Sequence, residues 1–586
     1  MLACLRRGSL LLASFFLLVM GLAEEALAQS DLPLPPGEII AGPIFRRNGT
    51  FVPEIDTGAN ANSYLNIGPP TEPFTPPADA NVVRTSVPTQ YVRAYTDGVT
   101  SPIGSFLAGS NAIRGLNAEQ IRNVLALPYL PDSLTIVQVP AGTCMIVGQA
   151  APILGNFPAN PPNIPTAGPW GKGGVQQERL IGISSEPGCA NPQFVPIENY
   201  INLQPIGAAA LSYQPRAGGG NTLAVARALD AGPYPELYTD MDSIYNSLDL
   251  INIGDGSTLR SALTQLGGEA YADIPTVETQ SARMFLDAVH DEVRLDRADT
   301  NAREVPVRQW LTGFGGAGGL DESGDLHGMD YQIAGVAGGI DRWLGPSFLA
   351  GFAVGYARSD FDANKISGSG DVNTVSGAVY ATYAPGRWYV DGALGFGHSE
   401  GTLDRSIVFP GVARQAKGEP TANAFLSNVE TGYSFALSRT TLLTPIAAMQ
   451  GIVVNEDGFA ESGAGAIDLI VHGNSTEAAI GLLGGELSQE VAVGLPAPLL
   501  IKLRAGWAHD FADTSRSFTA GFQGLPGPSF AISGVDAPGD AAVINVLASM
   551  TLRHSLDLFA RYDAAFASGS DGTSVQGGSA GFRFVF

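Results

Sequence analysis

Alternating apolar and polar positions run through the second half of the chain, from about residue 310 to residue 586. Residues 387–397 show the pattern clearly, because read as a strand they separate into two faces. One face holds Trp388, Val390, Gly392, Leu394 and Phe396, and the other holds Tyr389, Asp391, Ala393, Gly395 and Gly397. An apolar face backed by small and polar residues is typical of a strand between lipid and a water-filled lumen. At roughly 10 residues per strand plus turns, the region predicts a transmembrane barrel of about 12 antiparallel strands, within a range of about 10 to 14.

The last eight residues form the most informative of these predicted strands. They alternate between an aromatic face and a face with a charge: Phe582, Phe584 and Phe586 against Gly581, Arg583 and Val585. The alternatives, a soluble β-sandwich or an ordinary edge strand, would expose these phenylalanines to aggregation. The order is similar to the polar-x-Gly-x-x-apolar-x-aromatic signal by which bacterial outer-membrane barrels are recognised for assembly. The matching positions are Ser579, Gly581, Phe584 and Phe586. The resemblance implies the barrel assembly machinery and outer-membrane lipid as partners.

The N-terminus predicts a secretory signal peptide over residues 1–28. Arg6 and Arg7 precede an apolar run at residues 10–22, and Ala26-Leu27-Ala28 is a small-x-small cleavage site. The apolar run is too short to span a bilayer as a helix, and the sequence after it has no run of 18 consecutive apolar residues. We therefore expect export to the periplasm, the outer membrane or the outside.

Composition narrows the function classes further. The formal net charge is −24, with 32 Lys and Arg residues, so nucleic acid is not expected as a partner. Without the signal peptide two cysteines remain, Cys144 and Cys189. In an oxidising compartment a disulfide between them would contribute about 3 to 4 kcal/mol, and the alternative is two separate buried thiols. The six histidines lack metal-ligand spacing, so we expect no metal site.

Helical periodicity appears just before the barrel region. The apolar stripes are Leu237, Met241, Ile244, Tyr245, Leu248 and Leu250 in a first stretch, and Val277, Ala282, Phe285, Leu286 and Val289 in a second, at residues 276–297. A helix that leads straight into a barrel of this size can pass through its lumen and plug it. Residues 235–300 are therefore predicted as a helical linker and pore helix.

The order of these parts resembles the autotransporters, the type V secretion proteins that thread a passenger outward. The junction phrase LGGEAY at residues 266–271 and the strand YQIAGVAGGIDRW at residues 331–343 are similar to stretches of those proteins. The resemblance implies a monomeric barrel at residues 310–586, located in the outer membrane, with the helix in its pore. It also implies a passenger that lies at the cell surface or outside the cell, where a host or surface ligand would be its partner.

The passenger is predicted to begin after an extended Pro/Gly-rich segment, residues 29–85, and to form a small α+β domain at residues 86–230. A succession of motifs follows: Arg93, Gly104-Ser105, a helix near 117–127, VPAGT at 139–143, and Gly173-Gly174-Val175-Gln176-Gln177-Glu178. This succession resembles the NAD-glycohydrolase and ADP-ribosyltransferase-like domains of bacterial polymorphic toxins. It departs from them at Lys172, where a third glycine is often found, and in an inserted stretch at residues 156–169.

The resemblance implies catalytic roles for four residues and NAD as the substrate, with no cofactor assigned. Breaking the nicotinamide–ribose bond develops oxocarbenium character, so an acceptor beside the 2′-hydroxyl stabilises the transition state. Glu178, or Gln176, would be that acceptor. Arg93 would bind a diphosphate oxygen, and Ser105 would brace the late polar residue. The alternative is a non-catalytic adhesin or surface-binding passenger on the same barrel, in which these residues are ordinary surface groups.

Overall fold

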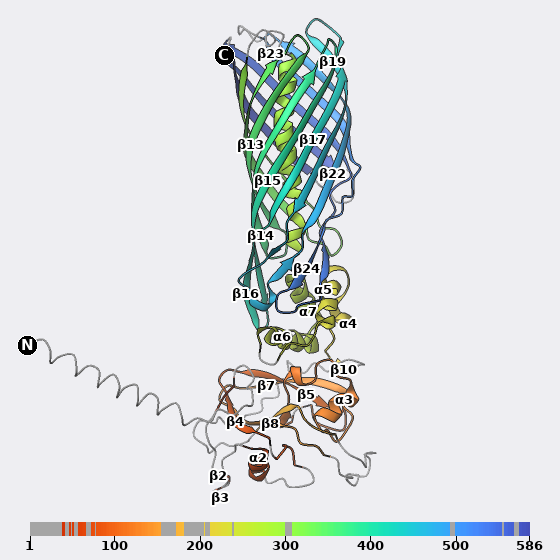
Figure 1. Cartoon of the computed structure of the whole chain (residues 1–586). Coiled ribbons are helices and arrows are strands. Elements are labelled where there is room, and N and C mark those ends of the chain that lie inside the picture. The colour runs from red at the N-terminus through yellow and green to blue at the C-terminus, as the bar shows by residue number, and fades with distance from the viewer. Residues whose placement is uncertain are drawn as a thin grey trace, which may run out of the picture. The chain divides into compact units, whose positions relative to one another are not determined.

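The computed structural model describes most of the barrel region and parts of the passenger. The described residues are 38–40, 46–47, 50–51, 57–65, 72–76, 78–102, 104–153, 171–180, 204–205, 211–236, 239–298, 307–492, 498–553, 556–567 and 574–585. The predicted signal peptide, Cys189 and Phe586 lie outside them. The chain divides into unit 1, Met1–Ser212 with Pro235–Gly256, and unit 2, Tyr213–Tyr234 with Ser257–Phe586. Each unit is described by itself (Figure 1).

Unit 2 contains a closed antiparallel barrel of 12 strands, as the alternation predicts. The strands are β11 Arg308–Leu320, β12 Met329–Trp343, β13 Phe348–Ala363, β14 Gly368–Tyr383, β15 Trp388–Phe409, β17 Thr421–Tyr433, β19 Thr441–Glu456, β22 Asn474–Val491, β23 Leu499–Asp510, β26 Asp540–Arg553, β27 Leu556–Ala567 and β28 Ser574–Val585. The short strands β16 Val412–Gly418 and β18 Phe435–Ala436 pair with β15 and β19. The barrel closes because β11, the first strand, pairs with β28, the last, with Leu311 opposite Phe582.

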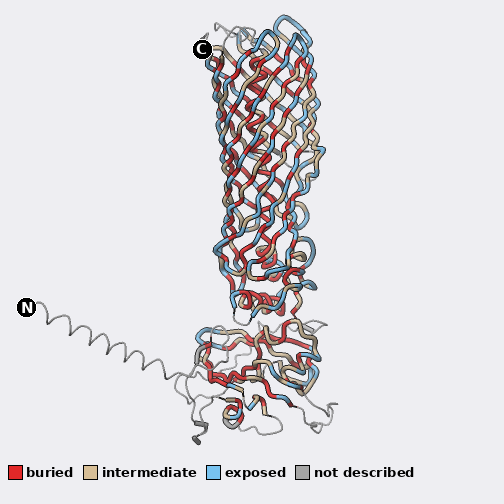
Figure 2. Tube along the Cα trace, in the orientation of Figure 1, coloured by how far each residue is buried: buried red, intermediate tan, exposed pale blue. Residues whose placement is uncertain are grey.

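The polarity of the two faces of β15 reverses along its length, while the same face stays buried. Trp388 and Phe396 are exposed on the outer face, and Asp391 is buried on the inner face. Beyond Phe396 the outer face carries His398 and Glu400, and the inner face carries buried Leu403 and Ile407. The first part is apolar outside and polar inside, as lipid requires, and the second part has the opposite arrangement of a soluble protein. Figure 2 shows buried and exposed residues alternating along the barrel strands.

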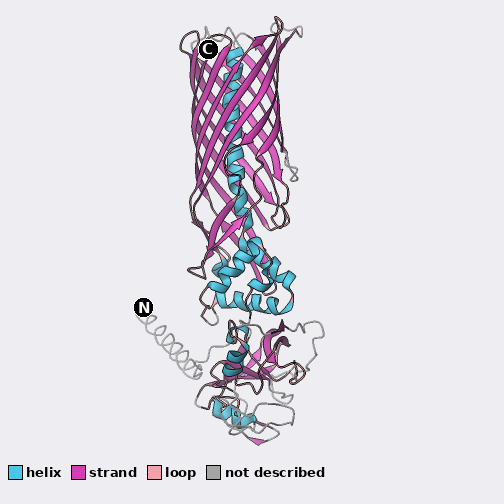
Figure 3. Cartoon of the chain, turned by 90° about the vertical axis from the view of Figure 1, so that its right-hand side faces the viewer, coloured by secondary structure: helices cyan, strands magenta, loops and turns pink. Residues whose placement is uncertain are grey.

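The lumen holds α8, Ile274–Ala298, a helix of 25 residues. It runs along the inside of the barrel in both views (Figures 1 and 3). The predicted helix at residues 276–297 is confirmed. Among the helices in the described ranges, none combines the length and apolar character that a membrane-crossing helix needs.

A small folded region, which we call the cap, continues one end of the barrel within unit 2 (Figure 3). Its elements are α4 Gln214–Ala217, α5 Gly220–Ala231, α7 Gly256–Gly267, the 3-10 helix η2 Glu269–Asp273, and a sheet of β20 Phe459–Ala460, β21 Leu469–Val471, β24 Ser517–Phe522 and β25 Phe530–Ser533. Arg405 pairs with Glu461 at 2.6 Å, and Tyr271 donates a hydrogen bond to Glu461 at 2.8 Å. These contacts hold the predicted junction phrase at the start of the lumenal helix.

Unit 1 contains two antiparallel sheets with a shared apolar core. The larger has the order β1 Glu38–Ile40, β4 Ala80–Thr85, β8 Cys144–Gln149, β9 Gln176–Leu180, β6 Phe106–Leu107, and the smaller has β10 Gln204–Pro205, β7 Ser133–Val139, β5 Thr89–Tyr95. The core holds Val83, Met145, Val147 and Leu180 from the first sheet and Tyr91, Val137 and Val139 from the second. Helices α2 Gly58–Leu65 and α3 Ala118–Val124 complete these elements, and Asn117 caps α3 through a capping box. Strands β1 and β4 and helix α2 lie within residues 29–85, the segment that the sequence predicts to be extended. The two strands form there because β1 pairs with β4, and β4 pairs with β8 of the larger sheet.

Helix α6, Asp240–Gly254, belongs to unit 1, although the sequence predicts it as part of the linker. Arg114 is buried and pairs with Asp249 at 2.8 Å and with Asp242 at 3.2 Å. Ile253 of the same helix lies in an apolar cluster with Ile113. Of the stripe read from the sequence, Tyr245 lies under the Arg114 guanidinium and Leu250 packs against the same apolar cluster, so these residues face unit 1. A fragment that ends at residue 230 would lack this helix and leave Arg114 without its carboxylates.

We expect Asp249→Ala to destabilise unit 1 by about 3 kcal/mol, near the lower end of the cost of breaking a buried ion pair, because Asp242 remains. The measurement is pulse proteolysis of the purified full chain over a urea series. Glu119→Gln, at an exposed position of α3, serves as the control and should leave the midpoint unchanged. An equal midpoint for Asp249→Ala and the wild type would contradict the assignment of α6 to unit 1.

Candidate functional site

The lumen is crossed by ion pairs between α8 and the barrel wall. Arg294 pairs with Glu486 at 2.7 Å, Arg297 with Asp391 at 3.1 Å, and Arg561 with Asp291. The wall residues lie on β22, β15 and β27, so the helix is held from several sides. Breaking one such buried pair leaves an uncompensated charge and is strongly unfavourable. The arrangement therefore fixes the position and rotation of the helix in the lumen.

Asp296 connects the helix to the seam at which the barrel closes. It pairs with Arg308 of β11 and, at 2.5 Å, with Arg583 of β28. Arg308 also pairs with Asp341 of β12 at 2.8 Å. Arg583 is thus the charged residue that the sequence places on the inner face of the last strand. Phe584 is exposed on the outer face, and Ser579 is buried.

Beside the helix, the described lumen contains cavities of about 180 and 80 Å³. Both are lined by Gln280 and Arg283 of α8 and by Val543 of β26. Cavities of this size and polarity accommodate water and small solutes, whereas a polypeptide needs more space. The lumen is therefore obstructed by its helix in this state.

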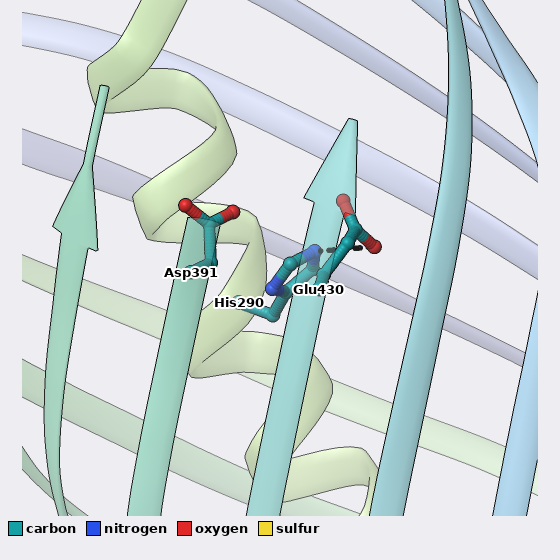
Figure 4. Close-up of side chains that lie close together, drawn as sticks. All are labelled: His290, Asp391 and Glu430. Atoms are coloured by element: carbon teal, nitrogen blue, oxygen red, sulfur yellow. Dashed lines mark ion pairs between the residues drawn. The ribbon is translucent and has the colours of Figure 1, made fainter. Parts of the chain in front are cut away.

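Two groups of carboxylates in the lumen have the spacing of metal ligands. His290, Asp391 and Glu430 have ligand atoms within 4.8 Å of one another, as do Glu292, Asp296 and Asp341. Figure 4 shows His290 on the helix facing Asp391 and Glu430 on neighbouring strands. Sequence spacing could not reveal these groups, because each group joins residues of α8 to strand residues far away in the sequence.

Arginines already pair with carboxylates of both groups, and we assign no metal to either. Arg297 pairs with Asp391 at 3.1 Å, and Arg504 pairs with Glu430 at 2.8 Å. In the second group the counter-charges are Arg308 and Arg583. A divalent cation would lie next to these guanidinium groups, whose positive charge opposes its binding.

The other candidate site is a cavity of about 300 Å³ within unit 1. It is lined by Thr89, Gln90, Tyr91, Gly109, Asn111, Ala112, Gly174, Val175, Gln176, Glu178, Asp242, Ser243 and Asn246. Of the predicted catalytic residues, Gln176 and Glu178 line it. A turn at Gly173 and Gly174, with φ of 66° and 110°, delivers the chain into β9 at this wall. A side chain on Gly173 would meet the backbone carbonyl of Ala150 at 2.3 Å, so the motif glycine is needed there.

Glu178 is buried in the core beside two residues that sequence reasoning did not identify. Tyr91 donates a hydrogen bond to Glu38, and both lie on the inner faces of the sheets. Burial, and then the negative charge of Glu38, raises the pKa of Glu178 well above its usual range. Burial raises the pKa of Glu38 to about 7, with the hydrogen bond from Tyr91 opposing the rise. Glu38 lies in the segment predicted to be extended, so its sequence context gave no signal.

Arg93 and Ser105 lie next to this cavity wall but are not among the described residues that line it. The Arg93 guanidinium donates to the carbonyl oxygens of Ser101 and Phe106, both at 2.9 Å, and burial lowers its pKa. Gly104 lets it approach, because a Cβ there would lie 2.3 Å from the Arg93 Cζ. The Ser105 carbonyl accepts from the Leu180 N–H at 2.8 Å. Both residues therefore support β6 beside the strand that carries Glu178.

Cys144 is fully buried in β8 and is disulfide-bonded. Its predicted partner, Cys189, lies outside the described residues.

The barrel matches a known family. Residues 309–563 match the family model described as Autotransporter beta-domain. Residues 309–563 of the barrel are therefore identified as an autotransporter β-domain, a barrel that lies in the outer membrane.

The chain is also similar to curated proteins and to solved structures. The chain is 22% identical over 230 residues to "Outer membrane protein A" of Rickettsia conorii, covering 37% of this chain and 11% of that protein. It is 27% identical over 215 residues to an "Uncharacterized protein in trpE-trpG intergenic region" of Pseudomonas putida, with 36% and 35% coverage. It is 22% identical over 334 residues to an "Extracellular serine protease" of Serratia marcescens, with 55% and 30% coverage. These matches span about a third or less of the relatives' lengths.

Among solved structures, the translocator domain of autotransporter NalP from Neisseria meningitidis aligns with a TM-score of 0.41 and 18% identity. That alignment covers 53% of this chain and 98% of that one. The β-domain of the Bordetella autotransporter BrkA aligns with a TM-score of 0.35 and 19% identity, covering 48% and 100%.

The raised pKa of Glu38 predicts how the stability of unit 1 depends on pH. The folded unit holds this proton up to a pH of about 7, whereas the unfolded chain releases it near the usual glutamate pKa. The contribution of Glu38 to the free energy of unfolding is therefore largest below about pH 4. This contribution falls by about 3 kcal/mol as the pH rises to about 7. Pulse proteolysis of the full chain between these pH values measures the slope. Glu38→Gln should flatten it and Glu119→Gln should not; equal slopes would contradict the assignment.

Proposed function

We propose that this chain carries its own N-terminal unit to the cell surface and holds it there through the helix in the lumen. The observation that carries the proposal is the continuous covalent path from unit 1 through α7 and η2 into α8, which occupies the lumen. The ion pairs of α8 with the wall support a retained helix, and the family match of residues 309–563 supports the transport role.

Surface exposure of unit 1 on intact cells tests the proposal. Externally added protease should degrade unit 1 and leave the barrel and a periplasmic marker protein intact. A chain that lacks residues 574–585 has no β28 to pair with β11, so it should lose both the heat-modifiable barrel band and the surface signal. Protection of unit 1 in intact cells that contain a folded wild-type barrel would refute surface delivery.

A second proposal concerns what the passenger does: it breaks the N-glycosidic bond of NAD. The specific observation is that Gln176 and Glu178 line one cavity with Tyr91 and Asn246. In the reaction the bond between ribose C1′ and the nicotinamide nitrogen breaks, and its electron pair neutralises the ring. Water adds its oxygen to C1′ and loses a proton to solvent through a carboxylate, giving ADP-ribose and nicotinamide. Gln176 or Glu178 would accept the hydrogen bond of the 2′-hydroxyl as positive charge develops.

The polar lining of the cavity favours one end of the substrate. The described residues that line it include Gln90, Gln176 and Asn246, whose side chains can bond to an amide, and they include no Lys or Arg. The nicotinamide end of NAD carries a carboxamide and no phosphate, so this end suits the cavity. The diphosphate would lie outside it, on the side of β5 and β6 that Arg93 supports.

We expect the purified full chain in detergent to consume NAD, and Glu178→Gln and Gln176→Ala to lower the rate about 10²-fold or more, the usual effect of removing a transition-state contact. Fluorimetric NAD quantification with detection of free nicotinamide is the measurement, and Glu119→Gln should keep wild-type activity. No turnover by a chain with folded unit 1 would refute the enzymatic proposal and favour a surface-binding passenger.

A further inference from the structure

The chain passes between its two units more than once. Unit 1 ends at Ser212, resumes at Pro235 and ends again at Gly256, so Tyr213–Tyr234 belongs to unit 2. Leu211 is buried in an apolar cluster of unit 1, and Tyr213, two residues later, is buried in unit 2. After this segment, α6 packs into unit 1 through Asp249 and Ile253. The segment Tyr213–Tyr234 is therefore joined at both of its ends to residues of unit 1, the passenger.

This segment, which contains α4 and α5, is packed into the cap. Val225 is fully buried, and a methyl group on Gly267 of α7 would lie 3.4 Å from its Cγ2 and 3.1 Å from Ile532 of β25. A methyl group on Gly232 would lie 2.6 Å from Leu525, so the end of α5 also approaches the cap closely. Apolar burial at this face favours the association of the segment with the cap.

Polar contacts fix the orientation of the segment on the cap. The Asn221 side chain accepts from the Ser533 N–H at 2.9 Å and donates to the Ser533 carbonyl at 2.8 Å, extending the pairing of β25. It also donates to Glu269 of η2 at 3.1 Å. Within the segment, Asp230 accepts from the backbone N–H of Tyr213 at 3.0 Å, which ties the start of α4 to α5.

We propose that the segment Tyr213–Tyr234 is a second, non-covalent tether, which keeps the passenger on the barrel even after the chain is cut between α6 and α7. The covalent attachment runs from α6 through α7 to the lumenal helix. The second attachment is the segment at residues 213–234, which lies before the cut in the sequence. After the cut this segment is still covalently joined to the passenger at both of its ends. A single cleavage at the exposed Asp255 therefore does not release the passenger.

The tether builds on the proposed surface delivery, but its test is independent of it. A seven-residue site for a sequence-specific protease is inserted next to Asp255, and the full chain is purified in detergent. After complete cleavage, size-exclusion chromatography and denaturing gels show whether the fragments on either side of residue 255 elute together. We expect co-elution. Surface delivery is judged separately, by protease access in intact cells, so failure of one does not imply failure of the other.

Variants on α5 identify the surface responsible. Val225→Asp places a carboxylate in the apolar contact, and after cleavage it should lower the co-eluting fraction several-fold. Asn221→Ala removes the hydrogen bonds to Ser533 and Glu269 and should give a smaller loss. Arg227→Ala, on the exposed face of the same helix, is the matched control and should behave as the wild type.

Three results would overturn the tether. Separation of the two fragments directly after cleavage of the wild-type chain is the first. Full co-elution of both the Val225→Asp and Asn221→Ala fragments is the second, because retention would then depend on other contacts. If Val225→Asp prevents folding before cleavage, urea-dependent dissociation of the cleaved Asn221→Ala and Arg227→Ala chains decides instead. Equal midpoints for these two chains would be the third contradictory result.

Discussion

The pairing of β11 with β28 is the constraint on which the rest of unit 2 depends. In lipid no water satisfies an unpaired backbone N–H or C=O, so a sheet can span the membrane only when it has no free edge. The two strands that meet here are the first and the last of the barrel. Asp296 of the lumenal helix pairs with an arginine on each of them. Closure of the barrel and seating of the helix therefore share one set of contacts.

The ion pairs in the lumen serve specificity more than net stability. Forming a buried pair costs desolvation on both sides, and the attraction roughly offsets this cost. Removing one partner is strongly destabilising, because the remaining buried charge then has neither a counter-charge nor water around it. Arg294, Arg297 and Asp296 face different strands, so a rotation or shift of the helix would break several pairs at once. One position of α8 is thereby selected over its neighbours.

The reversal along β15 explains how one barrel serves two surroundings. Up to Phe396 its outer face meets lipid, and its inner face meets the polar helix. Beyond that point the outer face carries His398 and Glu400, the inner face carries buried Leu403 and Ile407, and Arg405 on this inner face donates to the Gln265 carbonyl of the cap. The cap thus has an apolar core of the soluble kind, into which η2 and the segment Tyr213–Tyr234 can pack.

Local sequence patterns determined the barrel, its approximate strand number and the lumenal helix, because alternation and helical periodicity are properties of neighbouring residues. The aromatic and charged faces of the last strand were likewise readable from Phe582, Arg583 and Phe584. Only the tertiary structure decided that Glu38 and Tyr91 lie near Glu178, that Arg93 supports a loop, and that α6 belongs to unit 1 while α4 and α5 belong to unit 2. These outcomes depend on contacts between residues far apart in the chain, such as Arg114 with Asp249 and Asn221 with Ser533. A pattern of neighbouring residues does not indicate such contacts.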